Sequence, residues 1–114
     1  MNNAPEAEMK TRLLAFSLLF CGCVTTSLTP AGEKVRITAN PDAVKQCRYI
    51  GEVMGRDRMN GGFAGQWAAE ENAVRRLKNR AAYMGADTVL MVTNSTNTSG
   101  SVQRGEGYNC GGSK

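Results

Sequence analysis

The chain has 114 residues, 41% of them hydrophobic and 6% aromatic, with 14 Lys and Arg against 10 Asp and Glu, no His, and a formal net charge of +4. This length accommodates one domain. The absence of histidine removes the commonest general base, the commonest nitrogen ligand of zinc, and the Ser/His and Cys/His nucleophilic sites. We therefore expect a protein that is not an enzyme and that uses no cofactor.

The N-terminal region has the pattern of an export signal. Residues 13–20 are apolar apart from Ser17, and they follow the basic residues Lys10 and Arg12. A membrane-spanning helix needs about 20 apolar residues, whereas an apolar core of about 7 to 15 residues behind a basic segment is typical of a secretory signal peptide. The sequence therefore predicts a signal peptide over residues 1–22, with Met9 as the true start.

Residues 19–23, Leu-Phe-Cys-Gly-Cys, resemble a bacterial lipobox, in which a small residue precedes a cysteine that is acylated and becomes the mature N-terminus. Gly22 stands in the place of that small residue, while Phe20 and Cys21 depart from the usual Leu and Ala or Ser. The resemblance implies that Cys23 carries the lipid, and that Val24 after it directs the protein to the outer membrane. The alternatives are an ordinary cleaved signal peptide with an incidental cysteine, or a short buried helix.

Two cysteines, Cys47 and Cys110, remain in the exported part of the chain. In an oxidising compartment this pair predicts a disulfide, and closing a loop of about 64 residues would stabilise a small domain by about 4 kcal/mol. The alternative is a metal site with two thiolates, for which a sequence without histidine offers too few further ligands. We predict the disulfide and no bound metal.

The first half of the exported chain predicts a linker and two strands. Residues 24–32 are small and polar and contain proline and glycine, as a linker does, and nine residues reach at most about 30 Å. Residues 33–38 alternate between apolar and charged side chains and predict a first strand. A turn and a single helical turn over residues 40–46 precede a second strand over 48–55, in which Gly51 indicates a bulge or a close backbone approach.

The second half predicts a loop, a long helix and two more strands. The glycine-rich loop, residues 55–65, lacks the Lys-Ser/Thr that completes a phosphate-binding loop. Residues 66–84 predict a helix that ends at Gly85. Residues 88–93 are apolar on both faces and predict an inner strand. The remaining elements are a hairpin loop over 94–101, a last strand over 102–110, and a flexible tail over 111–114.

The predicted helix carries two contrasting faces. At 100° per residue, one stripe is expected to pack on the sheet: Trp67, Ala73, Val74, Leu77, Ala81 and Met84. Glu70 lies within that stripe, either as a functional carboxylate or as a residue near the helix start that is favoured by the helix dipole. The opposite face carries Arg75, Arg76 and Arg80, either as a solvated face or as a basic patch for anionic lipid, lipopolysaccharide or cell-wall polymer.

The expected architecture is a small two-layer α+β domain of order β-β-α-β-β over residues 33–110, with one long helix on a four-stranded sheet. A bond between Cys47 and Cys110 requires the second and fourth strands to be neighbours or nearly so, and to run antiparallel. Four carboxylates, Glu52, Asp57, Glu70 and Asp87, form no recognisable acid/base pair in the sequence.

Several segments together resemble a family of small uncharacterised proteobacterial lipoproteins, which is similar to the outer-membrane stress-sensor lipoprotein of the Rcs phosphorelay. The resemblance covers residues 33 to 110. It rests on Asn40-Pro41-Asp42-Ala43-Val44 with Cys47, on Tyr49-Ile50-Gly51-Glu52-Val53, on Leu77 to Ala82 leading into Gly85-Ala86-Asp87, and on Gly107-Tyr108-Asn109-Cys110. It implies the same fold, with Cys47 and Cys110 as one bridge. The sensor itself has four domain cysteines and a long proline-rich linker, which this chain lacks.

These observations predict an envelope lipoprotein of the outer membrane, facing the periplasm rather than the cell exterior. Residues 23–32 would form the lipidated N-terminus and linker, and the domain would bind or sense envelope components. Its expected partners are the membrane, through the lipid anchor, and an envelope protein, lipopolysaccharide or cell-wall polymer, but not nucleic acid. The alternative is a periplasmic module that binds a small ligand or a metal.

Overall fold

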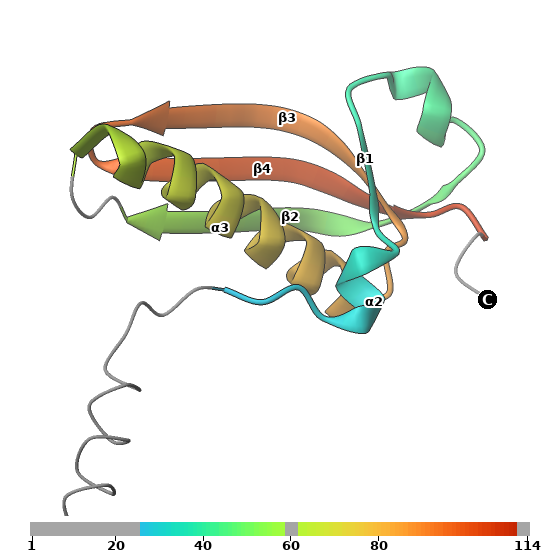
Figure 1. Ribbon diagram of the computed structural model, residues 1–114. Helices are drawn as coiled ribbons and strands as arrows, with labels where there is room; N and C mark the ends of the chain where they lie inside the picture. Colours follow the sequence, from blue (N-terminus) through green and yellow to red (C-terminus); the bar gives the residue numbers. More distant parts are fainter. Residues whose placement is uncertain (1–25, 59–61, 112–114) are drawn as a thin grey trace, which may run out of the picture.

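The structure is a computed structural model that describes residues 26–58 and 62–111 (Figure 1). A long helix lies across one face of a four-stranded sheet, as the sequence predicts. The elements in chain order are α2 (Pro30–Glu33), β1 (Arg36–Thr38), the 3-10 helix η1 (Pro41–Val44), β2 (Arg48–Arg58), α3 (Gly62–Tyr83), β3 (Thr88–Asn97) and β4 (Gly100–Asn109). The predicted α+β class and β-β-α-β-β order are confirmed.

The sheet has the strand order β1-β3-β4-β2. Strand β1 runs parallel to β3, whereas β4 is antiparallel to both of its neighbours. The second and fourth strands are therefore antiparallel neighbours, as the cysteine positions predict, and β3 is the predicted inner strand. The register between β2 and β4 shifts between Tyr49 and Gly51, in agreement with the bulge or close backbone approach expected at Gly51.

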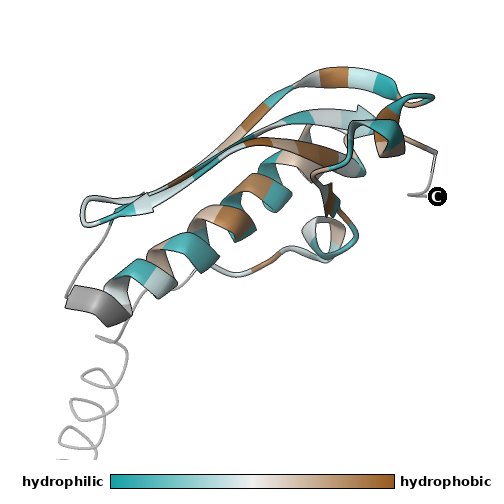
Figure 2. Ribbon diagram, turned by 90° about the horizontal axis from the view of Figure 1, so that it is seen from above, coloured by the Kyte–Doolittle hydropathy of each residue, from teal (hydrophilic) through white to brown (hydrophobic). Residues whose placement is uncertain are grey.

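The core is built from small side chains on α3. The buried residues of this helix recur at every fourth position: Gly65, Ala69, Ala73, Leu77 and Ala81. Such a series lets the helix lie very close to the sheet, and on β2 a glycine, Gly55, stands directly beneath the α3 backbone at Ala73 and Leu77. Val53 and Val89 complete the buried cluster from the sheet. In Figure 2 apolar and polar residues alternate along α3 where it lies beside the sheet.

One member of the predicted apolar stripe is misplaced. Trp67 is 77% exposed and lies outside the core. The predicted stripe is straight along the helix axis, whereas the residues that pack on the sheet are four positions apart. Four residues rotate by about 400°, so each packed residue is displaced by about 40° from the one before it, and Trp67 lies outside this series. Val74 is only partly buried, for the same reason.

Strands β2, β3 and β4 are longer and the loops between them shorter than predicted, whereas β1 is shorter than the predicted 33–38 because Glu33 belongs to helix α2. Strand β2 continues to Arg58 and α3 begins at Gly62, within the segment 55–65 that we expected to be a loop. Strands β3 and β4 extend through the expected hairpin loop, leaving a turn at residues 98 and 99. The polar residues of this hairpin are paired across the strands: Gln103 Nε2 donates to Asn94 Oδ1 over 2.8 Å, and the Thr96 and Ser101 hydroxyls lie 2.9 Å apart. Cross-strand hydrogen bonds thus replace the apolar alternation that normally reveals a strand.

Gly85, predicted to end the long helix, has a φ of 91°, the left-handed conformation in which glycine commonly terminates a helix. Among residues 26–58 and 62–111, no helix is long and apolar enough to cross a membrane.

Residues 26–32 differ from the expected linker, because they are packed on α3. Thr29 caps the short helix α2 through a hydrogen bond from Gly32 N to Thr29 Oγ1. Gly32 is buried, and a Cβ there would clash with the Asn79 side chain on α3. Small polar residues are typical of linkers, but they equally suit a segment that must lie close to a helix and bond to its side chains.

Candidate functional site

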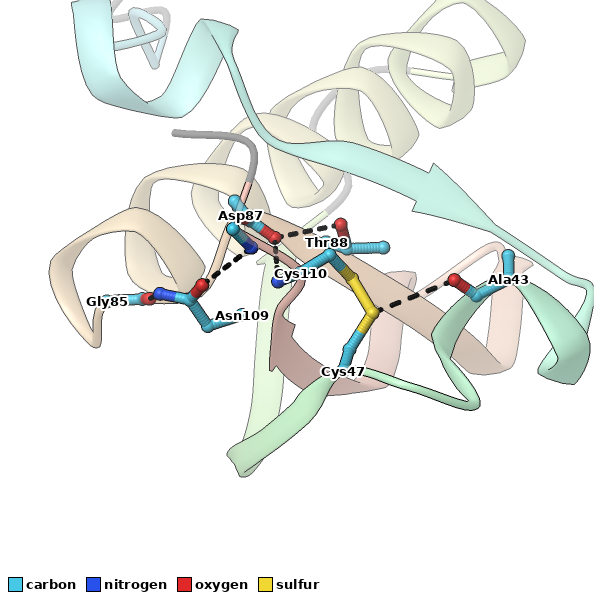
Figure 3. The surroundings of a disulfide bond; sticks show 8 residues. Ala43, Cys47, Gly85, Asp87, Thr88, Asn109 and Cys110 are labelled. Carbon is cyan, nitrogen blue, oxygen red and sulfur yellow. Dashed lines mark hydrogen bonds between the residues drawn. A yellow bond between two sulfur atoms is a disulfide. The ribbon is translucent and has the colours of Figure 1, made fainter. Parts of the chain in front are cut away.

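The Cys47–Cys110 disulfide joins the start of β2 to the end of β4 (Figure 3). The Cα atoms of the two cysteines lie 4.4 Å apart. Nearby, the buried carboxylate of Asp87 accepts hydrogen bonds from Cys110 N at 2.8 Å and from Thr88 Oγ1 at 3.0 Å. A covalent bond and a buried carboxylate therefore fix the same end of the sheet, which we call the disulfide end.

The opposite end of the domain, which we call the hairpin end, contains the β3–β4 turn, the end of β2 and the start of α3 (Figure 1). A surface hollow of about 510 Å³ lies here. Its charged lining consists of Arg56, Arg58, Arg76 and Asp57, and its polar lining includes Ser95, Asn97 and Ser99. Within the described ranges, Arg56 and Arg58 form no ion pair, so the hollow carries an excess of positive charge.

The N-terminal arm, residues 26–29, runs along α3. Thr26 N donates to Asn72 Oδ1 at 3.3 Å, and Arg76 Nε donates to Thr26 Oγ1 at 3.0 Å. Further along the helix, Asn79 accepts from Thr29 N at 2.9 Å and donates to Ser27 O at 2.9 Å. The arm and α3 therefore run in the same direction, and Thr26 is the residue of the arm nearest the hairpin end.

Replacing Asn79 with alanine is expected to release this arm. The change removes hydrogen bonds to Thr29 N, Thr29 Oγ1 and Ser27 O. We expect a loss of about 2 to 3 kcal/mol in unfolding free energy, because each of the three bonds contributes about 1 kcal/mol or slightly less. The Thr29 amide should also exchange its hydrogen faster, as measured by NMR. Exchange as slow as in the wild type would contradict the docking of the arm.

The three arginines of the predicted basic patch have different partners. Arg75 forms an ion pair with Glu71 at 3.7 Å, the i,i+4 pairing expected from the sequence. Arg76 lies 3.3 Å from Asp57 and also donates to Arg56 O at 2.8 Å. Arg80 lies over the Tyr83 ring, 5.9 Å from its centroid. Arg76 thus bonds the arm and β2 to the helix. The cations that are better placed to bind an external anion are Arg56 and Arg58, which the sequence analysis did not single out.

A second hollow, of about 520 Å³, lies on the side of α3 that faces away from the sheet. Its lining combines apolar and charged residues: Leu28, Trp67, Glu70, Glu71, Val74, Arg75 and Lys78. Glu70, which the sequence placed on the buried stripe, lines this open surface and is partly buried. The four-residue spacing of small side chains from Gly65 onward is the signal that would have placed Trp67 here.

A family model described as a domain of unknown function, DUF4156, matches residues 26–110. The chain belongs to this family. The match begins at Thr26, the first residue of the docked arm, so the arm is part of the DUF4156 domain. No curated protein matches the chain.

The carboxylates of the DUF4156 domain are spread over the fold. Asp57 pairs with Arg76, Glu52 lies 3.6 Å from Arg104, and Asp87 is at the disulfide end. In the part of the chain that the structure describes, no group of three or more Cys, Asp or Glu side chains is arranged to hold a metal ion. Cys23, the predicted lipidation site, lies outside the described residues.

The sheet face away from α3 carries a paired phenol and carboxylate. Tyr108 Oη donates to Glu106 Oε2 at 2.7 Å, and the Tyr108 ring packs edge-on against Tyr49 with centroids 5.5 Å apart. The hydrogen bond to Glu106, with smaller effects of desolvation and of the Glu106 charge, raises the pKa of Tyr108 above 10.0. Because the folded-state pKa is the higher one, this contribution to stability is present below pH 10 and is lost as the pH rises through the folded-state pKa.

Replacing Glu106 with alanine is therefore expected to lower the pKa of Tyr108 toward 10, measured by the ultraviolet absorbance of the phenolate. Glu52, the cross-strand partner of Glu106, forms its ion pair with Arg104 instead, so E52A is the matched control and should leave the Tyr108 titration in place. An unchanged titration in E106A would show that another group raises this pKa.

Proposed function

We propose that the chain is a non-enzymatic bacterial envelope lipoprotein, anchored in the outer membrane through a lipid on Cys23 and facing the periplasm. Its disulfide-stabilised domain binds or senses envelope components. The observation that carries the proposal is the Cys47–Cys110 disulfide, because such bonds persist in compartments outside the reducing cytosol. The predicted export signal and the lipobox-like residues 19–23 support the same compartment.

The docked arm supports anchoring close to the membrane. Thr26 is bonded to α3, so three residue steps separate the domain from Cys23, a reach of about 11 Å at most. This short connection differs from the long proline-rich linker of the Rcs stress sensor, which the chain otherwise resembles. We propose that anchoring and fold carry over from that resemblance, and that the partner is met at the membrane surface.

The alternative metal-binding module has less support. Its proposed thiolates belong to Cys47 and Cys110, which are joined to each other. Titration of the purified domain for free thiols and for bound metal separates the two functions, since the lipoprotein proposal expects neither.

Acylation of Cys23 is tested by growing cells on a fatty acid with a chemical label and measuring its incorporation into the protein. The wild-type chain and the matched control Cys21→Ser should carry the label, whereas Cys23→Ser should lose it and leave the membrane fraction. Label that persists in Cys23→Ser, or none in the wild type, would refute the lipid anchor.

A further inference from the structure

The only tryptophan of the chain is conspicuously exposed. Trp67 has 77% of its surface accessible and shares a hollow with the apolar side chains of Leu28 and Val74. Tryptophan is ordinarily well buried in a small domain, because its ring contributes much of the apolar area that a core can gather. An exposed tryptophan beside aliphatic residues is favourable at a membrane–water interface, where the ring meets headgroups.

The arm brings this surface near the proposed anchor. Thr26 lies against Asn72, and Trp67 precedes Asn72 by five residues on the same helix, about 8 Å along its axis toward the hairpin end. Three residue steps from Thr26 reach about 11 Å at most, so a lipid on Cys23 would be attached within about 11 Å of Thr26.

The charges at this end favour an anionic surface. Arg56 and Arg58 line the hollow at the end of β2 and have no ion-pair partner within residues 26–58 and 62–111. Around Trp67, the Arg75–Glu71 pair is neutral, and Lys78 balances Glu70. The net charge presented at the hairpin end is thus positive, and each arginine near an anionic bilayer contributes about a fivefold gain in binding.

We propose that the hairpin end of the domain rests on the anionic headgroup layer of the bilayer that holds the Cys23 lipid, with Trp67 in the interface and Arg56 and Arg58 against lipid phosphates. This inference rests on the proposed acylation of Cys23. The lipid is then one part of a defined docking surface, and the disulfide end of the domain, with Tyr49 and Tyr108, is directed into the periplasm.

Because Trp67 is the sole tryptophan, its fluorescence reports this contact directly. The protein purified with its anchor is placed in vesicles of phosphatidylethanolamine and phosphatidylglycerol that carry brominated acyl chains, which quench tryptophan on contact. We expect emission at shorter wavelength than in unfolded protein and strong quenching. The matched control W67F/Y83W moves the only tryptophan to the other end of α3, about 24 Å away, where Tyr83 is 85% exposed, and its emission should stay unquenched.

The arginines are tested in the same vesicles. R58Q is expected to lower the ratio of docked to undocked Trp67 about fivefold, and R56Q/R58Q further. Quenching that is unaffected by these variants would refute the role of the arginines. Emission at shorter wavelength without quenching would show that protein, such as a second copy of the chain, covers Trp67, and would overturn the proposal.

The mass of the same sample separates the two proposals. An acylated protein whose Trp67 is unquenched would overturn the docked orientation and leave the lipoprotein function standing. A protein without the lipid on Cys23 would overturn both.

Discussion

Removing the Cys47–Cys110 bond is expected to lower the free energy of unfolding by about 4 kcal/mol. The bond closes a loop with a sequence separation of 63 residues, and cross-linking a loop of this size restricts the unfolded chain strongly. The buried core is small and rich in alanine, so little else offsets the loss. A domain of this size is stable by only about 5 to 15 kcal/mol in total.

The measurement is denaturant unfolding of the wild type with and without a reducing agent, and of the double variant C47A/C110A. The double variant leaves no lone thiol and serves as the control for the reductant, which should not change its midpoint. Equal stability of the oxidised and reduced wild type would contradict the role of the bond as a staple.

Replacing Gly55 with alanine is expected to destabilise the domain by about 3 kcal/mol or more. A Cβ at this position would overlap the backbone carbonyl of Ala73 and lie 2.6 Å from the backbone nitrogen of Leu77, so α3 as a whole would have to move off the sheet. Backbone of a packed helix cannot yield as a flexible side chain does.

Gly51→Ala is the matched control on the same strand. Its Cβ would meet only Cε of Met84, at 3.1 Å, the far end of a flexible side chain. We expect this variant to lose no more than about 1 kcal/mol in the same denaturant titration. A Gly55→Ala domain as stable as Gly51→Ala would show that the helix does not lie as close to β2 as described.

Much of the fold could be predicted because its determinants are local. Gly85 ends the helix through its left-handed conformation, and the two cysteines, once paired, require their strands to be antiparallel and to be neighbours or nearly so. What could not be predicted depends on contacts distant in sequence. The polar hairpin of β3 and β4 is extended because Gln103 pairs with Asn94 across the strands. This pairing leaves no alternation of apolar residues in the sequence from which the strands could be predicted.

The candidate site was harder to predict than the fold, for a related reason. Helical geometry predicts that Arg76 lies on the open face of the helix, as a solvated side chain or in a basic patch, but its partner Asp57 comes from a segment that the sequence predicts to be a loop. Trp67 was assigned to the core on a fixed angular period, whereas the close approach at Gly55 selects every fourth residue of α3. In both cases tertiary packing decided which face of the helix is free.

The most direct test of an exported, acylated and oxidised protein is the intact mass of the chain extracted from cell membranes after its free thiols have been alkylated. The account predicts a chain that begins at Cys23, carries the added mass of acyl chains, and gains no alkyl group at Cys47 or Cys110. An unprocessed chain without lipid, alkylated at both of these cysteines, would contradict it.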